Sequence, residues 1–279
     1  MNQMNQENKH YSRNVIQSLD RGLIIMEYLS RSQDHMGLPE LAQLLDVDPS
    51  TVYRLLGTLL NRGFVVQDPV SKKYTLGLKV IELSRRAIDT IQIRVTSKSY
   101  LRKLVDETGE SSNLAIFSDK AAICIDHKMS QSPLAVTNEI GESFIYHATA
   151  IGKVILAFQP EDIREQILAN YTFERFTHNT ISSVGTLKNQ LELIRNYYFS
   201  VDDEERFLGV RCIAAPIFDF TEKLIAGIGI TGPSSRLSLD RFPSLITQVK
   251  KTGYELSIMS GFPQHKAYPI VDSIHQEIS

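Results

Sequence analysis

The chain has 279 residues, of which 42% are hydrophobic and 22% are charged, and its formal net charge is −2. This composition is typical of a folded soluble protein, and the length fits two unequal domains better than one. It contains no run of about 18 apolar residues, no signal-peptide pattern at its polar N-terminus, and only two well-separated cysteines, so we expect a cytoplasmic protein without a membrane span or disulfide framework.

Three helices are predicted after a loose tail over residues 1–12. The first begins near Ser18, which is a suitable capping residue. The second covers Leu38–Leu45 and the third covers Pro49–Asn61, because Asp48 followed by proline is a favourable helix start. The apolar positions of the first helix that recur at helical spacing are Leu19, Leu23, Met26 and Leu29.

A short hairpin follows the third helix, with strands at Phe64–Gln67 and Lys72–Leu76 and a basic tip. A short helix, a tight turn, a second helix and a basic hairpin form the layout of a winged helix-turn-helix, which binds DNA. The pattern alone also fits a three-helix bundle with a hairpin that does not bind DNA. A helix over Leu78–Thr96, with Leu78, Ile81, Ile88 and Ile91 near helical spacing, is expected to connect this part to the rest of the chain.

The remaining sequence mixes helices and strands, which indicates an α+β or α/β sheet domain with helices on one or both faces. No periodic pattern is found from Phe262 onward, so a loose tail is expected over residues 262–279. The predicted helices are Ser97–Thr108, His147–Phe158, Glu161–Ala169, Leu187–Tyr198 and Asp240–Ser260. The predicted strands are Asn113–Phe117, Ala121–His127, Arg211–Phe218 and Leu224–Thr231.

The sequence contains little evidence of motifs typical of enzymes. The run Gly227–Gly232 spells GxGxxG, but its glycines lie within a strand pattern and Pro233 follows, whereas a dinucleotide site places them between a strand and a helix. The seven histidines form no HxH or HxxxH pair, and no GxSxG motif is present. We therefore expect neither an enzyme nor a metal site nor a bound cofactor.

Several motifs in both halves resemble the IclR family of transcriptional regulators, in matching order over about residues 13 to 260. In the first half they are Ser18–Leu23, Leu38–Leu45, Ser50–Leu56, Arg62–Val65 and Tyr74–Gly77. In the second half they are His147–Lys153, Asp202–Glu205, Gly209–Pro216 and Gly232–Leu237. The resemblance implies a winged helix-turn-helix over 13–77, a linker helix over 78–96 and a GAF-like effector-binding domain over 97–261.

The recognition helix and the hairpin tip are the expected DNA contacts. Arg54 can donate to guanine, and hydroxyl or lysine side chains can contact phosphate. Where relatives often carry a basic residue near the start of the recognition helix, this chain has Pro49 and Ser50, so Arg54 and the hairpin lysines are expected to contribute more. The predicted DNA-binding residues are Ser50, Thr51, Tyr53, Arg54, Thr58, Lys72 and Lys73.

The resemblance also implies a small-molecule pocket in the second domain, where backbone amides near Ile151 could hold a carboxylate. Without the resemblance, Val210 and Cys212 fit core positions of a strand as well as they fit a binding pocket, and the acidic run at Asp202 is typical of a solvated loop. Gly229 stands where relatives can carry a hydroxyl, so we expect a roomier pocket with one donor fewer. The predicted effector-binding residues are Leu134, Val136, Ala150, Ile151, Gly152, Asp202, Val210, Cys212, Gly229 and Thr231.

The resemblance implies a sequence-specific regulator, by analogy a repressor, whose binding to double-stranded operator DNA responds to a carboxylate, sugar acid or aromatic acid. Because a single winged helix reads few base pairs, a homodimer or a dimer of dimers is expected, held together through the linker helix and the winged-helix domain. The alternative for the linker helix is that its apolar stripe packs against the first helix of the same chain. The alternative is a ligand-binding or scaffolding protein whose winged helix contacts other proteins.

Overall fold

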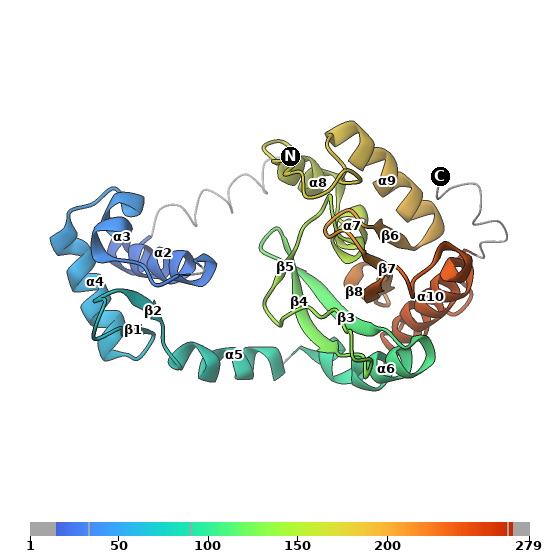
Figure 1. Ribbon diagram of the computed structural model, residues 1–279, viewed down its shortest axis with the longest axis horizontal. Helices are drawn as coiled ribbons and strands as arrows, with labels where there is room; N and C mark the ends of the chain where they lie inside the picture. Colours follow the sequence, from blue (N-terminus) through green and yellow to red (C-terminus); the bar gives the residue numbers. More distant parts are fainter. Residues whose placement is uncertain (1–14, 33, 90, 267, 270–279) are drawn as a thin grey trace. The chain divides into compact units, whose positions relative to one another are not determined.

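The computed structural model describes residues 15–32, 34–89, 91–266 and 268–269 (Figure 1). The chain divides into two compact units, and the division lies near residue 90. No helix in the described part of the chain is long and apolar enough to cross a membrane.

The first unit is a winged helix-turn-helix with its elements in the predicted order. Its small core is formed by buried side chains such as Ile25, Leu41, Val52 and Val65. Strands β1 and β2 pair antiparallel, with Val65 opposite Leu76. The elements are α2 (Gln17–Arg31), α3 (Leu38–Leu45), α4 (Pro49–Asn61), β1 (Val65–Gln67), β2 (Tyr74–Leu76) and α5 (Lys79–Asp89).

Helix α2 turns only part of its apolar residues to this core. It buries Gly22, Ile25 and Leu29, and it begins at Gln17, so Ser18 lies inside the first turn and is not the cap. The side chains of Leu19 and Leu23 are 60% and 51% exposed. These two leucines therefore lie outside the core, and α2 carries an apolar face that no described residue of its own unit covers.

The single helix expected over Leu78–Thr96 is divided in two. Helix α5 ends at Asp89, and α6 covers Gln92–Thr108. Ile91 has an extended backbone, with φ −76° and ψ 99°, and its side chain packs against the core of the second unit together with Ile93. The helical spacing of apolar residues in the sequence continues across this point. The helix nevertheless ends there, because Ile91 and Ile93 pack in the core of the second unit and α6 therefore begins as part of that unit.

The second unit is built on one antiparallel sheet of six strands. The strand order is β5-β4-β3-β8-β7-β6, so β3 and the longest strand, β8, form the central pair (Figure 1). The short strands β5 and β6 at the two edges were not predicted. The strands are β3 (Ser111–Ser118), β4 (Ala121–Lys128), β5 (Ser143–Phe144), β6 (Ser200–Asp203), β7 (Val210–Phe218) and β8 (Leu224–Pro233).

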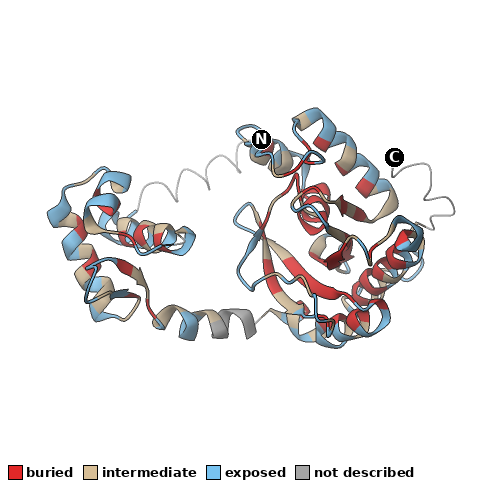
Figure 2. Cartoon of the chain, in the orientation of Figure 1, coloured by how far each residue is buried: buried red, intermediate tan, exposed pale blue. Residues whose placement is uncertain are grey.

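Helices cover both faces of this sheet, and the side chains of each strand alternate between them. On β7, Ile213 and Ile217 join one core with α6 and α10 (Phe242–Met259), whereas Cys212 and Ala214 join a second core with α7 (Ala150–Ala157) and α9 (Val184–Tyr197). Burial is concentrated along the sheet and these helices (Figure 2). The described part also contains α8 (Glu161–Leu168) and the short 3-10 helix η1 (Leu239–Arg241).

The segment after α10 is not loose throughout. Phe262 and Tyr268 are buried and pack with Phe218 in a small aromatic core. The Tyr268 hydroxyl donates to the Pro216 carbonyl oxygen at 2.7 Å and lies 2.7 Å from the Ser257 hydroxyl. The expectation of a tail from residue 262 is therefore wrong up to residue 269, apart from residue 267, and the rest of that expectation lies outside the described residues.

Candidate functional sites

Helix α4 presents the predicted DNA-reading side chains on its outer face. Val52 and Leu56 are buried, while Ser50, Arg54 and Thr58 are exposed, Tyr53 is 66% exposed and Thr51 is half-buried. Asp48 is the N-cap residue, but its side chain makes no capping hydrogen bond, contrary to the expected role. The Thr58 hydroxyl donates to the Arg54 carbonyl oxygen at 3.1 Å, which leaves its oxygen as an acceptor.

The hairpin tip is held by Asp68. Its Oδ1 accepts hydrogen bonds from the backbone amides of Val70 at 3.0 Å and Ser71 at 2.6 Å, and the bonds from Ser71 are the main cause that lowers the pKa of this carboxyl. Lys72 adopts a left-handed backbone with φ 60°, and both Lys72 and Lys73 are exposed. The tip thus presents two cations from an ordered turn, and their contact with DNA stays a prediction.

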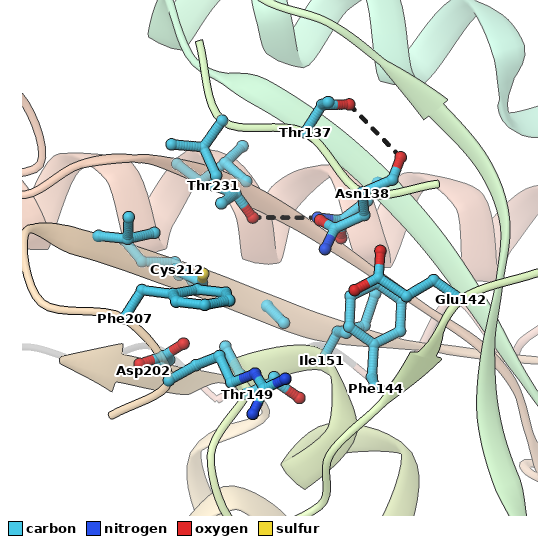
Figure 3. Close-up of a pocket in the computed structure, with 18 residues that line it drawn as sticks. Thr137, Asn138, Glu142, Phe144, Thr149, Ile151, Asp202, Phe207, Cys212 and Thr231 are labelled. Carbon is cyan, nitrogen blue, oxygen red and sulfur yellow. Dashed lines mark hydrogen bonds between the residues drawn. The ribbon is translucent and has the colours of Figure 1, made fainter. Parts of the chain in front are cut away.

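The second unit contains a cavity of about 190 Å³ next to the sheet, the start of α7, the β4–β5 connection and the loop between β6 and β7 (Figure 3). Most of the predicted effector residues line it. These are Val136, Ala150, Ile151, Asp202, Val210, Cys212 and Thr231. Leu134 is 64% exposed and is not part of the lining, and neither Gly152 nor Gly229 belongs to it.

Gly152 and Gly229 allow close packing of the backbone and do not provide space for a ligand. A Cβ atom at Gly152 would lie 2.5 Å from Thr149 Oγ1 and 2.7 Å from the Ile145 carbonyl oxygen. A Cβ atom at Gly229 would lie 2.7 Å from the Ile213 carbonyl oxygen and 3.3 Å from Asn113 Oδ1. The expectation that Gly229 makes the pocket roomier is therefore wrong, because neighbouring strand atoms occupy that space.

Several lining residues were missed by the sequence analysis. Four of the eight named below lie in the irregular β4–β5 connection or on β3, where no motif points to them. Arg206 and Phe207 directly follow the acidic run Asp202–Glu205, which was the one available signal for them. The missed polar and aromatic residues are Asn113, Thr137, Asn138, Glu142, Phe144, Thr149, Arg206 and Phe207.

A row of polar side chains crosses the sheet under the cavity. Asp202 on β6 is paired with Cys212 on β7, which is paired with Thr231 on β8. Side chains of directly opposed residues point to the same face. The row continues to β3, where Asn113 Nδ2 donates to Thr231 Oγ1 at 3.1 Å and to Asn138 Oδ1 at 3.0 Å. Hydrogen-bonding groups are thus lined up on an otherwise apolar floor.

Asp202 is the buried acid of this row, with 1% of its surface exposed. Burial, and then the negative charge of Glu205, raise its pKa to about 7, although Lys153 opposes the shift. Its Oδ1 accepts a hydrogen bond from the Glu205 amide at 2.7 Å. Burial also raises the pKa of the Cys212 thiol well above its usual value, so the thiol stays protonated and is a poor nucleophile.

A buried ion pair joins helix α7 to the loop after β6. Lys153 Nζ lies 2.6 and 2.7 Å from the two carboxylate oxygens of Glu205, and the lysine side chain is only 1% exposed. The Glu205 carbonyl oxygen also accepts hydrogen bonds from Thr180 at 2.7 Å and Thr177 at 3.3 Å. These contacts hold the first turn of α7 against the acidic run. Both residues end a motif of the sequence analysis, but the sequence did not indicate that they form an ion pair.

Helix α7 begins at the cavity. Thr149 caps it by accepting the Gly152 amide at 3.2 Å on its Oγ1, and the Lys153 amide donates to the Thr149 carbonyl oxygen at 3.0 Å. Within the described residues, the amides of Ala150 and Ile151 have no hydrogen-bond acceptor. Two free donors at the positive end of a helix dipole favour an anion.

Arg206 is the cation of the cavity lining. Its guanidinium lies 3.8 Å from the centre of the Phe176 ring and 5.1 Å from that of Phe207, and no described carboxylate forms an ion pair with it. Stacking fixes the plane of the guanidinium without neutralising it. The cavity therefore has a positive group that remains available to a negatively charged molecule.

The arrangement is suited to binding and not to catalysis. Both ring nitrogens of His147 are occupied, Nδ1 at 2.9 Å from the Tyr171 hydroxyl and Nε2 at 2.8 Å from the Glu174 carbonyl oxygen, so this histidine orders its surroundings. Among the described residues, no three His, Cys, Asp or Glu side chains are grouped in a way that could hold a metal ion.

Two family models match the chain. Residues 18–69 match the IclR helix-turn-helix domain, and residues 85–258 match the bacterial transcriptional regulator IclR C-terminal domain. The chain is 34% identical to the transcriptional repressor IclR of Escherichia coli K12 over 248 residues, which cover 88% of this chain and 90% of that protein. It is 29% identical to the regulator XynR of the same strain, over 89% of this chain and 99% of that protein.

A solved structure agrees with the fold. The crystal structure of a putative IclR transcriptional regulator from Silicibacter sp. TM1040 superimposes with a TM-score of 0.79, covering 91% of this chain and all of that chain at 23% sequence identity. At this identity the likeness concerns the fold alone, which is a helix-turn-helix unit followed by an α+β unit with a curled sheet.

Proposed function

Because this chain belongs to the IclR family of DNA-binding transcriptional regulators, which are not enzymes, we propose that it is a repressor whose operator binding is controlled by a small organic acid held in the cavity of the second unit. Relatives that the chain matches over most of its length include proteins named as repressors. The cavity of about 190 Å³ suits a molecule of few heavy atoms.

The unpaired guanidinium of Arg206 is the observation that supports an acid as the effector. A cation that lines a partly enclosed cavity attracts a carboxylate, and an arginine can bind both of its oxygens. The free amides of Ala150 and Ile151 add donors for the same kind of group. The carboxylate is proposed to bind at this end of the cavity, while Asp202 and Thr231 contact the polar remainder of the acid.

The acid-binding proposal is tested with the full chain and a panel of small carboxylic acids in a thermal-shift assay. A ligand that binds only the folded state raises its melting temperature. Arg206→Gln is expected to remove this increase while leaving the melting temperature without ligand nearly unchanged, since the side chain is half-buried and forms no ion pair. Equal stabilisation of the Gln variant would contradict the role of Arg206.

Operator binding is proposed to depend on Arg54 for base reading and on Lys72 and Lys73 for phosphate contacts. In a gel-shift assay with DNA from the region upstream of the chain's own gene, Arg54→Ala is expected to lose about 1–3 kcal/mol of specific binding. Lys72→Ala should weaken binding to all DNA similarly and lower the salt slope by about one unit. An unchanged ratio of specific to nonspecific affinity in Arg54→Ala would contradict base reading.

A homodimer, or a dimer of dimers, is proposed as the working unit. The exposed apolar face of α2, formed by Ile16, Leu19 and Leu23, supports self-association, since it is unusually apolar for a solvated helix. On α5, Leu78 and Ile81 at the start of the predicted linker are 76% and 63% exposed. Of the other two positions in the expected stripe, Ile91 packs against its own unit, and the Ile88 side chain lies outside the described residues.

A further inference from the structure

The Asn113 side chain is buried in the polar row, and half of its hydrogen-bonding capacity is unused. Only 4% of its surface is exposed, and its Nδ2 donates to Thr231 Oγ1 and Asn138 Oδ1. Its Oδ1 is buried and has no hydrogen-bond partner. A buried acceptor without a donor costs free energy, so such an atom at a cavity indicates a site for a donor from a ligand.

Neither neighbouring strand supplies that donor. On one side Asn113 is paired with Gly229, which has no side chain, and a Cβ atom there would already lie 3.3 Å from Asn113 Oδ1. On the other side it is paired with His127, whose buried Nδ1 also has no partner. Asn113 belongs to the lining of the cavity, so a molecule bound there is the remaining source of a donor.

The rest of the lining limits the chemistry of this donor. An acidic molecule is drawn by Arg206, so the group that reaches Asn113 belongs to an acid. Within such a molecule a hydroxyl satisfies Asn113 Oδ1 without adding a positive charge to a cavity that already contains a guanidinium. A hydroxyl can also accept, which suits the Thr231 hydroxyl beside it.

We propose that Asn113 is a specificity-determining residue whose Oδ1 accepts a hydrogen bond from a hydroxyl group of the effector, so that the cavity selects hydroxylated acids over the same acids without the hydroxyl. The proposal rests on the acid-binding function proposed above. It adds a requirement that Arg206 and the α7 amides do not impose, since those groups recognise any carboxylate.

The test measures dissociation constants by calorimetry on the full chain for matched pairs of acids. The pairs are glycolate and acetate, lactate and propionate, 3-hydroxybutyrate and butyrate, and 4-hydroxybenzoate and benzoate. In the pairs that bind, the hydroxylated acid is expected to bind at least about tenfold more tightly, since its analogue leaves Asn113 Oδ1 unsatisfied. In Asn113→Leu, which is similar in size, this ratio should fall to about one through loss of affinity for the hydroxylated acid.

Asn196→Leu serves as the control, because Asn196 is exposed on α9 and is not part of the cavity lining. It should keep the ratio of the unaltered chain. Equal affinity for both members of a pair, or a ratio that survives in Asn113→Leu, would overturn the role of Asn113 while leaving acid binding intact. Binding of none of the acids would instead reject the proposed acid effector. If Asn113→Leu does not fold, the ratio measured on the unaltered chain decides alone.

Discussion

At the scale of single residues, the cavity combines groups whose charges depend on burial. Asp202 is kept largely protonated below neutral pH, and Lys153 and Glu205 form a buried ion pair. The two sites are linked, because the Glu205 amide donates to Asp202 Oδ1. Asp202, Lys153 and Glu205 are therefore the residues at which pH and substitution should act most strongly.

Asp202 should make the folded state less stable as pH rises from about 4 to about 7. Its folded pKa of about 7 lies above the ordinary value of 3.8, so over this window the folded state binds more protons than the unfolded state, and its stability advantage is lost as pH rises. Asp202→Asn keeps the acceptor for the Glu205 amide and removes this titration. The melting temperature of the variant, relative to that of the unaltered chain, should therefore be higher near pH 8 than near pH 5.

An equal change in melting temperature at both pH values would contradict the raised pKa. Asp203→Asn is a suitable comparison, because Asp203 is the next residue of the same strand and forms an ion pair with Arg211 at 2.6 Å on the more exposed side. Its removal should not reproduce the pH dependence attributed to Asp202.

Lys153→Met should lower the free energy of unfolding by roughly 3–5 kcal/mol, because it leaves the Glu205 carboxylate buried without a counter-charge. Adding Glu205→Leu to this variant should recover much of the loss, since an apolar pair needs no compensation. Urea unfolding of the two single variants and the double variant measures the coupling. Additive losses would show that the two groups do not depend on each other.

At the scale of elements, helix α4 contains a glycine that its own packing does not require. Gly57 lies in the middle of Pro49–Asn61, and a Cβ atom there would meet no other atom within 4 Å. By contrast, a Cβ atom at Gly77 would overlap the Gly63 carbonyl oxygen, so that glycine is needed for the turn between β2 and α5.

Gly57→Ala should therefore raise the free energy of unfolding by up to about 1 kcal/mol, because alanine loses less backbone entropy in a helix. Gly77→Ala should lower it, since the backbone must shift to accommodate the methyl group. Thermal unfolding followed by circular dichroism separates the two. A destabilising Gly57→Ala would mean that α4 is less regular than the contacts around Gly57 indicate.

At the scale of the whole molecule, the two units carry opposite net charge. Residues 1–90 contain 11 Lys and Arg against 10 Asp and Glu, and the remainder contains 19 against 22, which gives +1 and −3. The difference is small, so affinity for DNA has to come from a few well-placed side chains and from pairing of two recognition helices. Self-association is therefore the property on which operator binding should depend most.

The combined substitution Leu19→Glu and Leu23→Glu should convert a dimer to a monomer in sedimentation velocity at micromolar concentration. Both side chains are exposed, so the first unit should still unfold at nearly the same temperature. Val70→Glu at the hairpin tip, where Val70 is 89% exposed, is the matched control and should remain dimeric. A monomer before any substitution, or a dimer that survives both glutamates, would exclude this face of α2 as the interface.

The sequence by itself determined the local elements and the family. The helix start at Pro49, the hairpin after the third helix and the strand patterns of β7 and β8 depend on neighbours in the chain, and such signals are short-range. For the same reason the GxGxxG run was correctly placed within a strand, now β8. The polar residues that the family resemblance selected on β6, β7 and β8 also lie together, since the strands that carry them are adjacent.

Only the tertiary structure decided which apolar residues face a core and which polar residues meet. Leu19 and Leu23 recur at helical spacing, yet both side chains are exposed. The helical pattern is interrupted at Ile91, because the side chain of this residue packs against the core of the second unit. Asn113 and Thr231 are 118 positions apart, and Lys153 and Glu205 are 52 apart. Contacts over such separations are set by strand order and helix packing, so no local pattern could have indicated the orphaned acceptor or the buried ion pair.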